Sequence, residues 1–283
     1  MIKIRGKEIR FEEFPNGETR FSKESICTGD LMNLSICTIR LKYENDSDLI
    51  KLMFLKNYID SHIRLAKVNL IIHYMPYSRM DRSENESPFT LKYVANFINN
   101  LNFNEVFVIE PHSDVTTALL NRAKAMFINF DLIESVKEEV KFDDDKDYLM
   151  FPDAGAAKRY EKMKAKNVLT GHKHRDFETG KIERLDLVGD VSNAKGRTAI
   201  IVDDLSSYGG TFIKSSETLR KAGFKEVYLL VAHAEDNVLK GDLFNHIDKL
   251  FTTNSIISEE KTTEWHNAKY KQQIKIFDLE YLI

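Results

Sequence analysis

Two adjacent carboxylates, Asp203 and Asp204, follow the apolar run 199–202 and precede a loop rich in hydroxyl groups and glycine. If 199–202 is a strand of an open parallel α/β sheet, this loop lies at the edge where such sheets bind ligands. Glycines let backbone N–H groups converge on an anion, and the start of a following helix adds partial positive charge. Because carboxylates accept hydrogen bonds from sugar hydroxyls, the segment 200–212 predicts a ribose-phosphate site.

The predicted acceptor contacts come from the end of this strand, the loop and the first residue of the expected helix. They are Asp203, Asp204, Ser206, Ser207, Tyr208, Gly209, Gly210 and Thr211. A tight strand-to-helix turn with an aspartate cap is the alternative interpretation. It accounts less well for paired carboxylates beside a hydroxyl-rich glycine loop.

Other polar segments occur in a fixed order along the rest of the chain. They are Phe-Pro-Asn-Gly-Glu at 14–18, Tyr-Met-Pro-Tyr-Ser-Arg-Met-Asp-Arg at 74–82, Glu-Pro-His-Ser at 110–113, Phe-Pro-Asp-Ala-Gly-Ala-Ala-Lys-Arg at 151–159, Lys-His-Arg at 173–175, Leu-Val-Gly-Asp-Val at 187–191 and Thr-Thr-Asn-Ser at 252–255. In this order, and over most of the chain, they resemble the ribose-phosphate pyrophosphokinases. The segment 200–212 alone resembles the phosphoribosyl-pyrophosphate loop of the type I phosphoribosyltransferase fold.

This resemblance implies an enzyme that transfers the β,γ-diphosphate of ATP to the anomeric hydroxyl of a ribose 5-phosphate unit and releases AMP. It also implies Mg²⁺ bridging the triphosphate. Little covalent work falls to the protein in phosphoryl transfer, so positioning and charge stabilisation dominate. In the family the hairpin at 14–18 reaches the ATP of a neighbouring subunit, which implies a homo-oligomer, a dimer or larger.

The resemblance further implies a role for each matching residue. Phe14 would stack on adenine, with Asn16 and Glu18 at its edge. Arg79, Asp81 and His112 would contact ATP, and His112 and Asp153 would hold the metal, partly through water. The implied catalytic set is Lys173, Arg175, Asp203 and Asp204.

Taken singly, these residues have structural alternatives. Phe14 could be a core residue, and Arg79 with Asp81 could form a local ion pair of little energetic weight. His112 could cap a helix, as could Asp153, since aspartate is a good N-cap. Lys173 and Arg175, in a polar segment, could be surface charge. Only their ordered combination favours the functional interpretation.

The phosphate loop departs from the family at one point: Ser207-Tyr208 stands where Asp-Thr is usual. An aromatic ring there offers a stacking face, and loss of a negative charge would ease the approach of a second phosphate. We therefore hypothesise ADP-ribose as the acceptor, as in a similar bacteriophage branch that makes ADP-ribose pyrophosphate for NAD resynthesis. The alternative acceptor is ribose 5-phosphate. A phosphoribosyltransferase and a non-catalytic regulatory subunit are further alternatives.

The elements that must position these residues follow from apolar runs and helical periodicity. Strands are expected at 68–73, 106–109, 148–151, 198–202 and 227–232, with a hairpin of 9–14 and 19–27. Helical faces run from Leu49 to Ile63 and from Leu91 to Leu101, and a helix at 211–222 should stop at Gly223. Alternating strands and helices predict an α/β fold with mainly parallel sheets. The acidic stretch 137–147 suggests two phosphoribosyltransferase-like domains, 1–136 on the ATP side and 137–283 carrying the acceptor loop.

Composition excludes several classes of function. The net charge is −3 with 41 Lys and Arg against 44 Asp and Glu, so no global attraction to nucleic acid or anionic membrane is expected. The polar start lacks a signal peptide, and no apolar run is long enough to cross a bilayer. Cys27 and Cys37 are too few for a disulfide framework and are expected as small strand residues. A cytoplasmic location follows by default.

Overall fold

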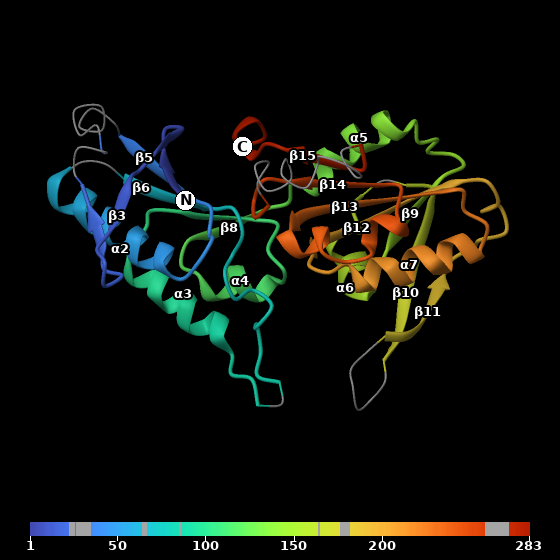
Figure 1. Cartoon of the computed structure of the whole chain (residues 1–283), viewed down its shortest axis with the longest axis horizontal. Coiled ribbons are helices and arrows are strands. Elements are labelled where there is room, and N and C mark those ends of the chain that lie inside the picture. The colour runs from blue at the N-terminus through green and yellow to red at the C-terminus, as the bar shows by residue number, and fades with distance from the viewer. Residues whose placement is uncertain are drawn as a thin grey trace. The chain divides into compact units, whose positions relative to one another are not determined.

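The computed structural model describes residues 1–22, 26, 35–63, 67–84, 86–163, 165–175, 182–257 and 272–283, with backbone alone at 175, 182 and 183. The chain forms two compact units, Met1–Phe127 and Ile128–Ile283. Each unit contains a mainly parallel sheet with helices along it (Figure 1). The predicted α/β class with two such sheets is therefore confirmed.

The first unit is built on a six-stranded sheet of order β2-β1-β5-β6-β7-β8. Its four consecutive strands from β5 to β8 are parallel, and β1 joins β5 antiparallel. The bounds are β1 Ile2–Ile4, β2 Lys7–Glu8, β5 Ile36–Leu41, β6 Lys67–Ile72, β7 Val106–Ile109 and β8 Ala123–Met126. The predicted strands at 68–73 and 106–109 are β6 and β7, and Cys37 is buried in β5 as expected.

Three helices of the first unit follow its strands: α2 Ser47–His62, α3 Thr90–Asn100 and α4 Asp114–Leu119. The periodic apolar residues predicted for α2 and α3 contribute to the hydrophobic core of the first unit. Of these, Leu52, Leu55, Leu91 and Ile98 are fully buried. A separate two-stranded sheet, β3 Phe11–Glu13 with β4 Thr19–Phe21, forms the predicted hairpin. Residue 27 lies outside the described residues. The structure therefore describes neither Cys27 nor the end of the second predicted strand.

The second unit has a seven-stranded sheet of order β11-β10-β9-β12-β13-β14-β15. All neighbouring pairs are parallel except β10 with β11. The bounds are β9 Tyr148–Phe151, β10 Asn167–Arg175, β11 Ile182–Val188, β12 Thr198–Ser206, β13 Glu226–Ala234, β14 Lys249–Thr253 and β15 Ile274–Phe277. The predicted strand at 198–202 is longer in the structure, because pairing with β13 continues through Asp203, Leu205 and Ser206.

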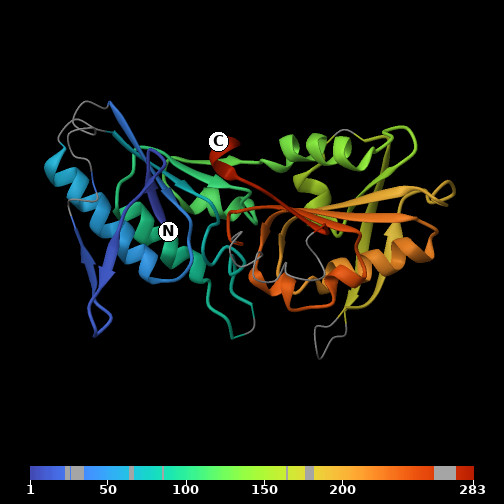
Figure 2. The ribbon, with the colours of Figure 1, turned by 45° about the horizontal axis from the view of Figure 1, so that its top comes forward.

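Helices cover both faces of the second sheet. α5, Asn129–Val140, lies on one face and α7, Gly210–Lys221, on the other (Figures 1 and 2). The short α6, Ala154–Arg159, packs on β9, β10 and β12. Gly223 has φ +104° directly after α7, which confirms the predicted C-terminal stop, since this region favours glycine. The described part of the unit also contains short 3-10 helices, η2 Asp236–Leu239, η3 Leu243–Asn245 and η4 Leu279–Tyr281.

The two units divide after Phe127, whereas the predicted boundary between residues 136 and 137 falls inside α5. That helix packs on β13 and buries Leu132, Ile133 and Val136, so its apolar face belongs to the second unit. The acidic run after it forms an ordered turn, in which the buried Asp147 side chain accepts hydrogen bonds from the backbone N–H groups of Asp143 and Thr198.

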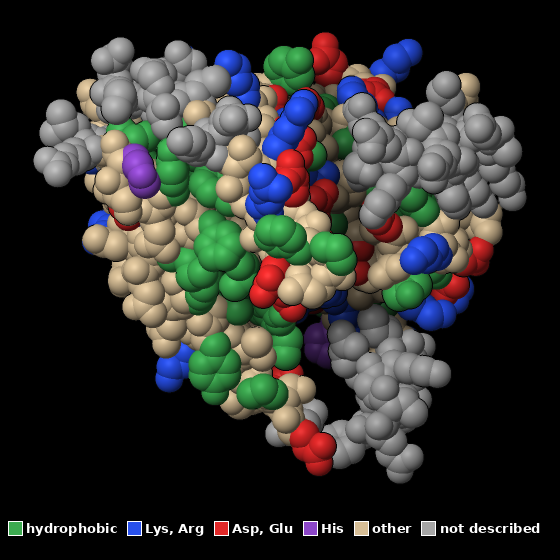
Figure 3. Space-filling model, turned by 60° about the vertical axis from the view of Figure 1, so that its left-hand side comes forward, with side chains coloured by type: hydrophobic (Ala, Val, Ile, Leu, Met, Phe, Trp, Pro, Cys, Tyr) green, Lys and Arg blue, Asp and Glu red, His purple; other side chains and the backbone are tan. Residues whose placement is uncertain are grey.

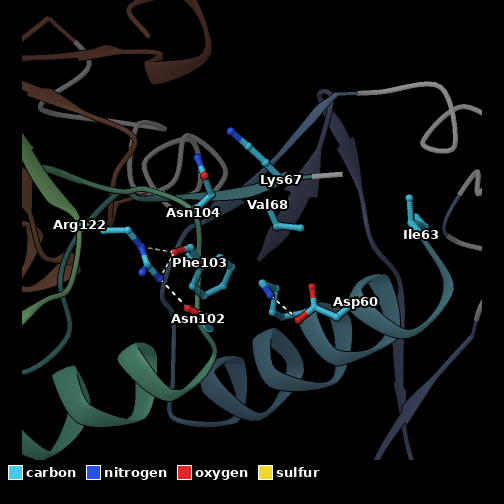
Figure 4. Close-up of a pocket in the computed structure, with 9 residues that line it drawn as sticks. Asp60, Ile63, Lys67, Val68, Asn102, Phe103, Asn104 and Arg122 are labelled. Carbon is cyan, nitrogen blue, oxygen red and sulfur yellow. Dashed lines mark hydrogen bonds and ion pairs between the residues drawn. The ribbon is translucent and has the colours of Figure 1, made fainter. Parts of the chain in front are cut away.

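A pocket of about 460 Å³ opens at the amino ends of β6, β7 and β8 in the first unit (Figure 4). Two of its cations, Lys56 and Arg122, bind protein groups. Arg122 donates from Nε and Nη2 to the carbonyl of Phe103, at 2.8 and 2.5 Å, and from Nη2 to Asn102. The buried Lys56 pairs with Asp60 at 2.5 Å and lies 5.3 Å from the Phe103 ring centroid. The contacts of Arg122 therefore hold the turn before β7.

Arg122→Ala should lower the free energy of unfolding by about 1.5–3 kcal/mol, the usual range for charge-assisted hydrogen bonds. Urea unfolding of the full chain measures this. Lys124→Ala is the matched control, because the 59% exposed Lys124 pairs with Glu105 at the surface, where an ion pair contributes about 1 kcal/mol or less. Equal losses in the two variants would contradict a specific role for Arg122.

Candidate functional site

The predicted carboxylate pair lies at the carboxyl end of β12 and shares one guanidinium. Arg159 Nη1 is 3.0 Å from Asp204 Oδ1 and 3.5 Å from Asp203 Oδ1. All three side chains are mostly buried, with exposures of 13% for Arg159, 15% for Asp203 and 6% for Asp204. Two neighbouring carboxylates in such a place need a counter-charge, and α6 ends on the residue that supplies it.

Asn129 fixes the main chain beneath this pair. Its Nδ2 donates to the Asp203 carbonyl and to the Tyr160 hydroxyl, both at 2.9 Å. Burial raises the pKa of Asp203 well above its usual range, and the neighbouring charge of Asp204 raises it further. The Arg159 guanidinium opposes this rise. The site thus holds two oxygen-rich acceptors in a fixed orientation, as binding of adjacent sugar hydroxyls requires.

The loop after β12 has the backbone geometry that an anion site needs. Gly209 has φ +80° and caps α7, and a Cβ there would lie 2.9 Å from the Leu243 side chain. Glycine is therefore required at this position for both conformation and space. Tyr208 is 59% exposed, and the buried Ser206 hydroxyl has no hydrogen-bond partner within the described part of the chain. The structure brings the predicted loop residues together at one sheet edge.

Lys173 and Asp153 meet in the second unit. Lys173 Nζ lies 2.6 Å from Asp153 Oδ2, and Lys173 is only 13% exposed, so it is not the surface charge that its polar segment allowed. Asp153 also caps α6 through Ala156 N at 3.0 Å, as its alternative role predicted. Burial alone would raise the pKa of Asp153, but hydrogen bonds from Lys173 and Ala156 lower it below the ordinary value.

Arg175 ends β10, two residues after Lys173, and its side chain lies outside what the structure describes. Between them, His174 is on the opposite face of the strand, where its Nε2 lies 3.0 Å from Asp186 Oδ2. β10 pairs with β11 through Lys173 and Leu185, so an antiparallel ladder holds the lysine in place. The candidate phosphate-binding lysine therefore lies on a paired strand, next to a register shift between His174 and Arg175.

The hairpin of the first unit presents its predicted adenine contacts to solvent. Phe14 is 47% exposed rather than a core residue, and Asn16 and Glu18 are exposed beside it. The turn is closed by hydrogen bonds from Phe14 N to the Glu18 carbonyl and from Gly17 N to the Phe14 carbonyl, both 2.8 Å.

Hydrophobic side chains reach the surface at several separate places on the face shown in Figure 3, among charges of both signs.

The remaining predicted ATP contacts follow two neighbouring parallel strands of the first unit. Arg79 is exposed in the turn after β6, and His112 is half-buried just after β7. Asp81 is buried, and its Oδ1 accepts a hydrogen bond from Arg82 Nε at 3.1 Å. Asp81 therefore forms an ion pair with the next residue along the chain. These segments share the carboxyl edge of one sheet, as ligand-binding loops do.

The donor chemistry at Asp153 and His112 suits a metal ion held mainly by other ligands. Among the described residues, no group of three His, Cys, Asp or Glu side chains could hold a metal. Both carboxylate oxygens of Asp153 already accept hydrogen bonds, from Lys173 and Ala156. Mg²⁺ at nucleotide sites commonly keeps several waters and takes few protein ligands beside the phosphates. Asp153 in the second unit and His112 in the first each offer a donor of a kind that such an ion can accept, directly or through water.

Comparison with known proteins identifies the class. Residues 133–283, more than half of the chain, match the model of the phosphoribosyl synthetase-associated domain. The chain resembles a crystal structure of phosphoribosylpyrophosphate synthetase from Mycobacterium smegmatis with TM-score 0.69 and 20% identity, over 98% of this chain and 87% of that one. The fold is thus that of phosphoribosylpyrophosphate synthetase, with two phosphoribosyltransferase-like domains.

Curated relatives give the family. A ribose-phosphate pyrophosphokinase of Mycoplasmopsis pulmonis is 26% identical over 95% of this chain and 83% of its own. That of Pyrococcus furiosus is 30% identical over 67% of each chain. The chain belongs to the ribose-phosphate pyrophosphokinase family and is an enzyme of the pyrophosphokinase class. None of the helices in the described residues is long and apolar enough to cross a membrane.

Proposed function

We propose that the enzyme transfers the β,γ-diphosphate of ATP to the anomeric hydroxyl of a ribose 5-phosphate unit and releases AMP. The observation that carries this proposal is the Asp203–Asp204 pair, held by Arg159 at the end of β12 and followed by the Gly209 loop at the start of α7. Carboxylates for sugar hydroxyls and backbone N–H groups for a phosphate stand next to each other in one unit.

In this proposal each unit contributes one part of the machinery. The second unit holds the acceptor on Asp203, Asp204 and 206–211, and the first contributes ATP contacts from 14–18, Arg79, Asp81 and His112. Lys173 and Arg175 act on the transferring phosphates, Lys173 as a point charge and Arg175 through a planar fork. These residues orient the acceptor hydroxyl toward the β-phosphorus and stabilise the charge that develops there.

We propose Mg²⁺ as the cofactor, held by His112 and Asp153 partly through water. When bound it neutralises charge on the triphosphate. The chemistry of Asp153 supports this assignment, because carboxylate oxygens are ligands that Mg²⁺ accepts. We also propose a homo-oligomer of at least two chains, supported by the exposure of Phe14, Asn16 and Glu18 on the hairpin.

For the acceptor, free ribose 5-phosphate is the first proposal. The names of the relatives from Mycoplasmopsis pulmonis and Pyrococcus furiosus both specify ribose phosphate. ADP-ribose is the second candidate, supported by one feature of this chain: the ring of Tyr208 is 59% exposed at the rim of the loop. An exposed aromatic face can stack on a base or sugar beyond the 5′-phosphate.

AMP release with ATP, Mg²⁺ and each acceptor at equal concentration tests the function and ranks the acceptors. We expect AMP formation that depends on an acceptor, with ribose 5-phosphate turned over faster. Faster turnover of ADP-ribose would reverse the ranking. No AMP release with either acceptor, together with consumption of phosphoribosyl pyrophosphate and a base, would instead indicate a phosphoribosyltransferase.

Tyr208→Thr separates the two acceptors by a residue-specific effect. If Tyr208 stacks on ADP-ribose, the variant should raise KM for ADP-ribose about tenfold, since stacking on one aromatic contributes roughly 1–3 kcal/mol. KM for ribose 5-phosphate should stay unchanged. Tyr281→Thr is the control, because Tyr281 is 89% exposed on η4 and has no part in the loop. Equal KM values for ADP-ribose in wild type and Tyr208→Thr would remove Tyr208 from acceptor recognition.

A further inference from the structure

The acceptor loop is tied to the neighbouring strand by a carboxylate. Ser207 Oγ donates to Glu235 Oε2 at 2.5 Å, and Asn237 Nδ2 lies 3.4 Å from the same oxygen. The Glu235 backbone N–H donates to the Ser206 carbonyl at 2.9 Å. Glu235 follows β13 and Ser207 follows β12, one position beyond the last paired residues, Ser206 and Ala234. Two hydrogen bonds thus join the first turn of the loop to Glu235.

This contact accounts for the single proton of the Ser207 hydroxyl. A serine hydroxyl has one O–H to donate, and a carboxylate can only accept. Without a ligand that proton is directed to Glu235, so a contact of Ser207 with an acceptor phosphate would compete with this hydrogen bond. Backbone N–H groups of the loop, at the start of α7, are further donors for the phosphate. Ser207 therefore positions the loop through Glu235 in addition to its proposed place among the acceptor contacts.

The contact between Ser207 and Glu235 also places a negative charge at the rim of the acceptor loop. The family commonly has aspartate where this chain has Ser207, and loss of that carboxylate suggested an easier approach for a second phosphate. The structure shows a carboxylate within hydrogen-bond distance of the Ser207 side chain, supplied by Glu235 from the next strand. The rim of the loop thus keeps a negative charge, and the electrostatic argument for a diphosphate acceptor loses its basis.

We infer that Glu235 is a positioning and specificity-determining residue of the acceptor site, which replaces the loop's own carboxylate from the neighbouring strand. It holds the loop through Ser207 and the Ser206 carbonyl, and its charge limits how tightly an anionic acceptor binds. This inference rests on the proposed function, since it assigns Glu235 to the acceptor half of that site.

Glu235→Gln tests the charge apart from the hydrogen bond, because the glutamine Oε1 still accepts from Ser207. A unit charge about 4 Å from a bound phosphate corresponds to about a three- to tenfold change in affinity at the dielectric constant of water, which suits an exposed loop. We expect KM for ribose 5-phosphate to fall by about that factor, with kcat and the KM for ATP unchanged. Glu235→Ala, which also removes the hydrogen bond, should instead raise KM for ribose 5-phosphate.

A charge relocation supplies the rescue. Ser207→Asp combined with Glu235→Gln returns a carboxylate to the loop, and KM for ribose 5-phosphate should move back toward the wild-type value. The matched control is Glu226→Gln, at the start of β13, where Glu226 Oε2 accepts from Thr198 Oγ1 at 3.2 Å. It makes the same change on the same strand, roughly 30 Å away at about 3.3 Å per residue, and should leave both KM values unchanged.

Calorimetric titration with ribose 5-phosphate and with inorganic phosphate, without ATP, separates this inference from the proposed function. A wild-type enzyme that binds and turns over ribose 5-phosphate, with Glu235→Gln indistinguishable from it, would overturn the role of Glu235 alone. Wild-type protein that binds neither ligand and releases no AMP would overturn both. Tighter binding in Glu235→Gln, lost again in the double variant, supports the inference.

Discussion

Arg159→Ala is expected to lower the free energy of unfolding by about 3–5 kcal/mol, the usual cost of leaving buried charges without their partner. The guanidinium lies within 3.5 Å of both carboxylates, and all three side chains are mostly buried. Without it, Asp203 and Asp204 repel each other in a place where water screens little. We expect uptake of a proton by the pair, because burial and Asp204 already raise the pKa of Asp203.

Turnover should fall in the same variant, because a protonated or displaced pair binds sugar hydroxyls poorly. Urea unfolding measures the loss of stability, the ribose 5-phosphate titration measures acceptor binding, and AMP release measures turnover. Arg159→Lys keeps the charge but replaces the planar guanidinium by a compact, more strongly hydrated ammonium, so we expect an intermediate loss. Arg220→Ala is the matched control: Arg220 pairs with Asp248 at 2.6 Å in a half-exposed place, where about 1 kcal/mol or less is expected. Wild-type stability and acceptor binding in Arg159→Ala would refute the role.

Lys173→Ala is expected to lower kcat by about 10²–10³-fold, the range seen when one preorganised group that stabilises transition-state charge is removed. Lys173 lies on the paired strand β10 and is held by Asp153 at 2.6 Å. Its charge is therefore fixed before the reaction. Because we place Lys173 on the transferring phosphates, KM for ribose 5-phosphate should change little.

Steady-state kinetics at saturating ATP and Mg²⁺ check this result, with Lys166→Ala as the control. Lys166 also pairs with an aspartate, Asp145, at 3.1 Å, but it is 67% exposed, so its loss should leave kcat unchanged. A kcat near the wild-type value in Lys173→Ala would remove this lysine from the catalytic set. A rise in KM for ribose 5-phosphate with unchanged kcat would place it on the acceptor instead.

The long, strongly patterned elements could be predicted from sequence. The strands 106–109 and 148–151 are β7 and β9, and the helical periodicities found α2 and α3. For β5, Ile36–Leu41, only the strand position of Cys37 was predicted and not the bounds, and β8, Ala123–Met126, was not predicted. β8 has no fully buried residue, and its alternating small and charged side chains carry little apolar signal. What makes them strands is pairing with β6 and β7, which only the assembled sheet supplies.

The order of motifs along the chain was enough to indicate the family and the ribose-phosphate loop. The motif order did not indicate that Arg159, Asn129 and Glu235 are parts of the site. Arg159 stood at the end of a matched segment, but nothing in the spacing of 159 and 203 pairs them. Glu235 lies 28 residues after Ser207, and their contact arises because β12 and β13 are neighbouring parallel strands.

The sequence by itself determined which side chains this protein can use: two carboxylates before a glycine loop, and a lysine two residues from an arginine. Local order fixes these features, because a strand end, a turn and a helix start are set by a dozen consecutive residues. Only the tertiary structure decided where charge is compensated. Arg159 neutralises Asp203 and Asp204, and Glu235 replaces a carboxylate missing from the loop, because electrostatic energy depends on distance in space and not along the chain.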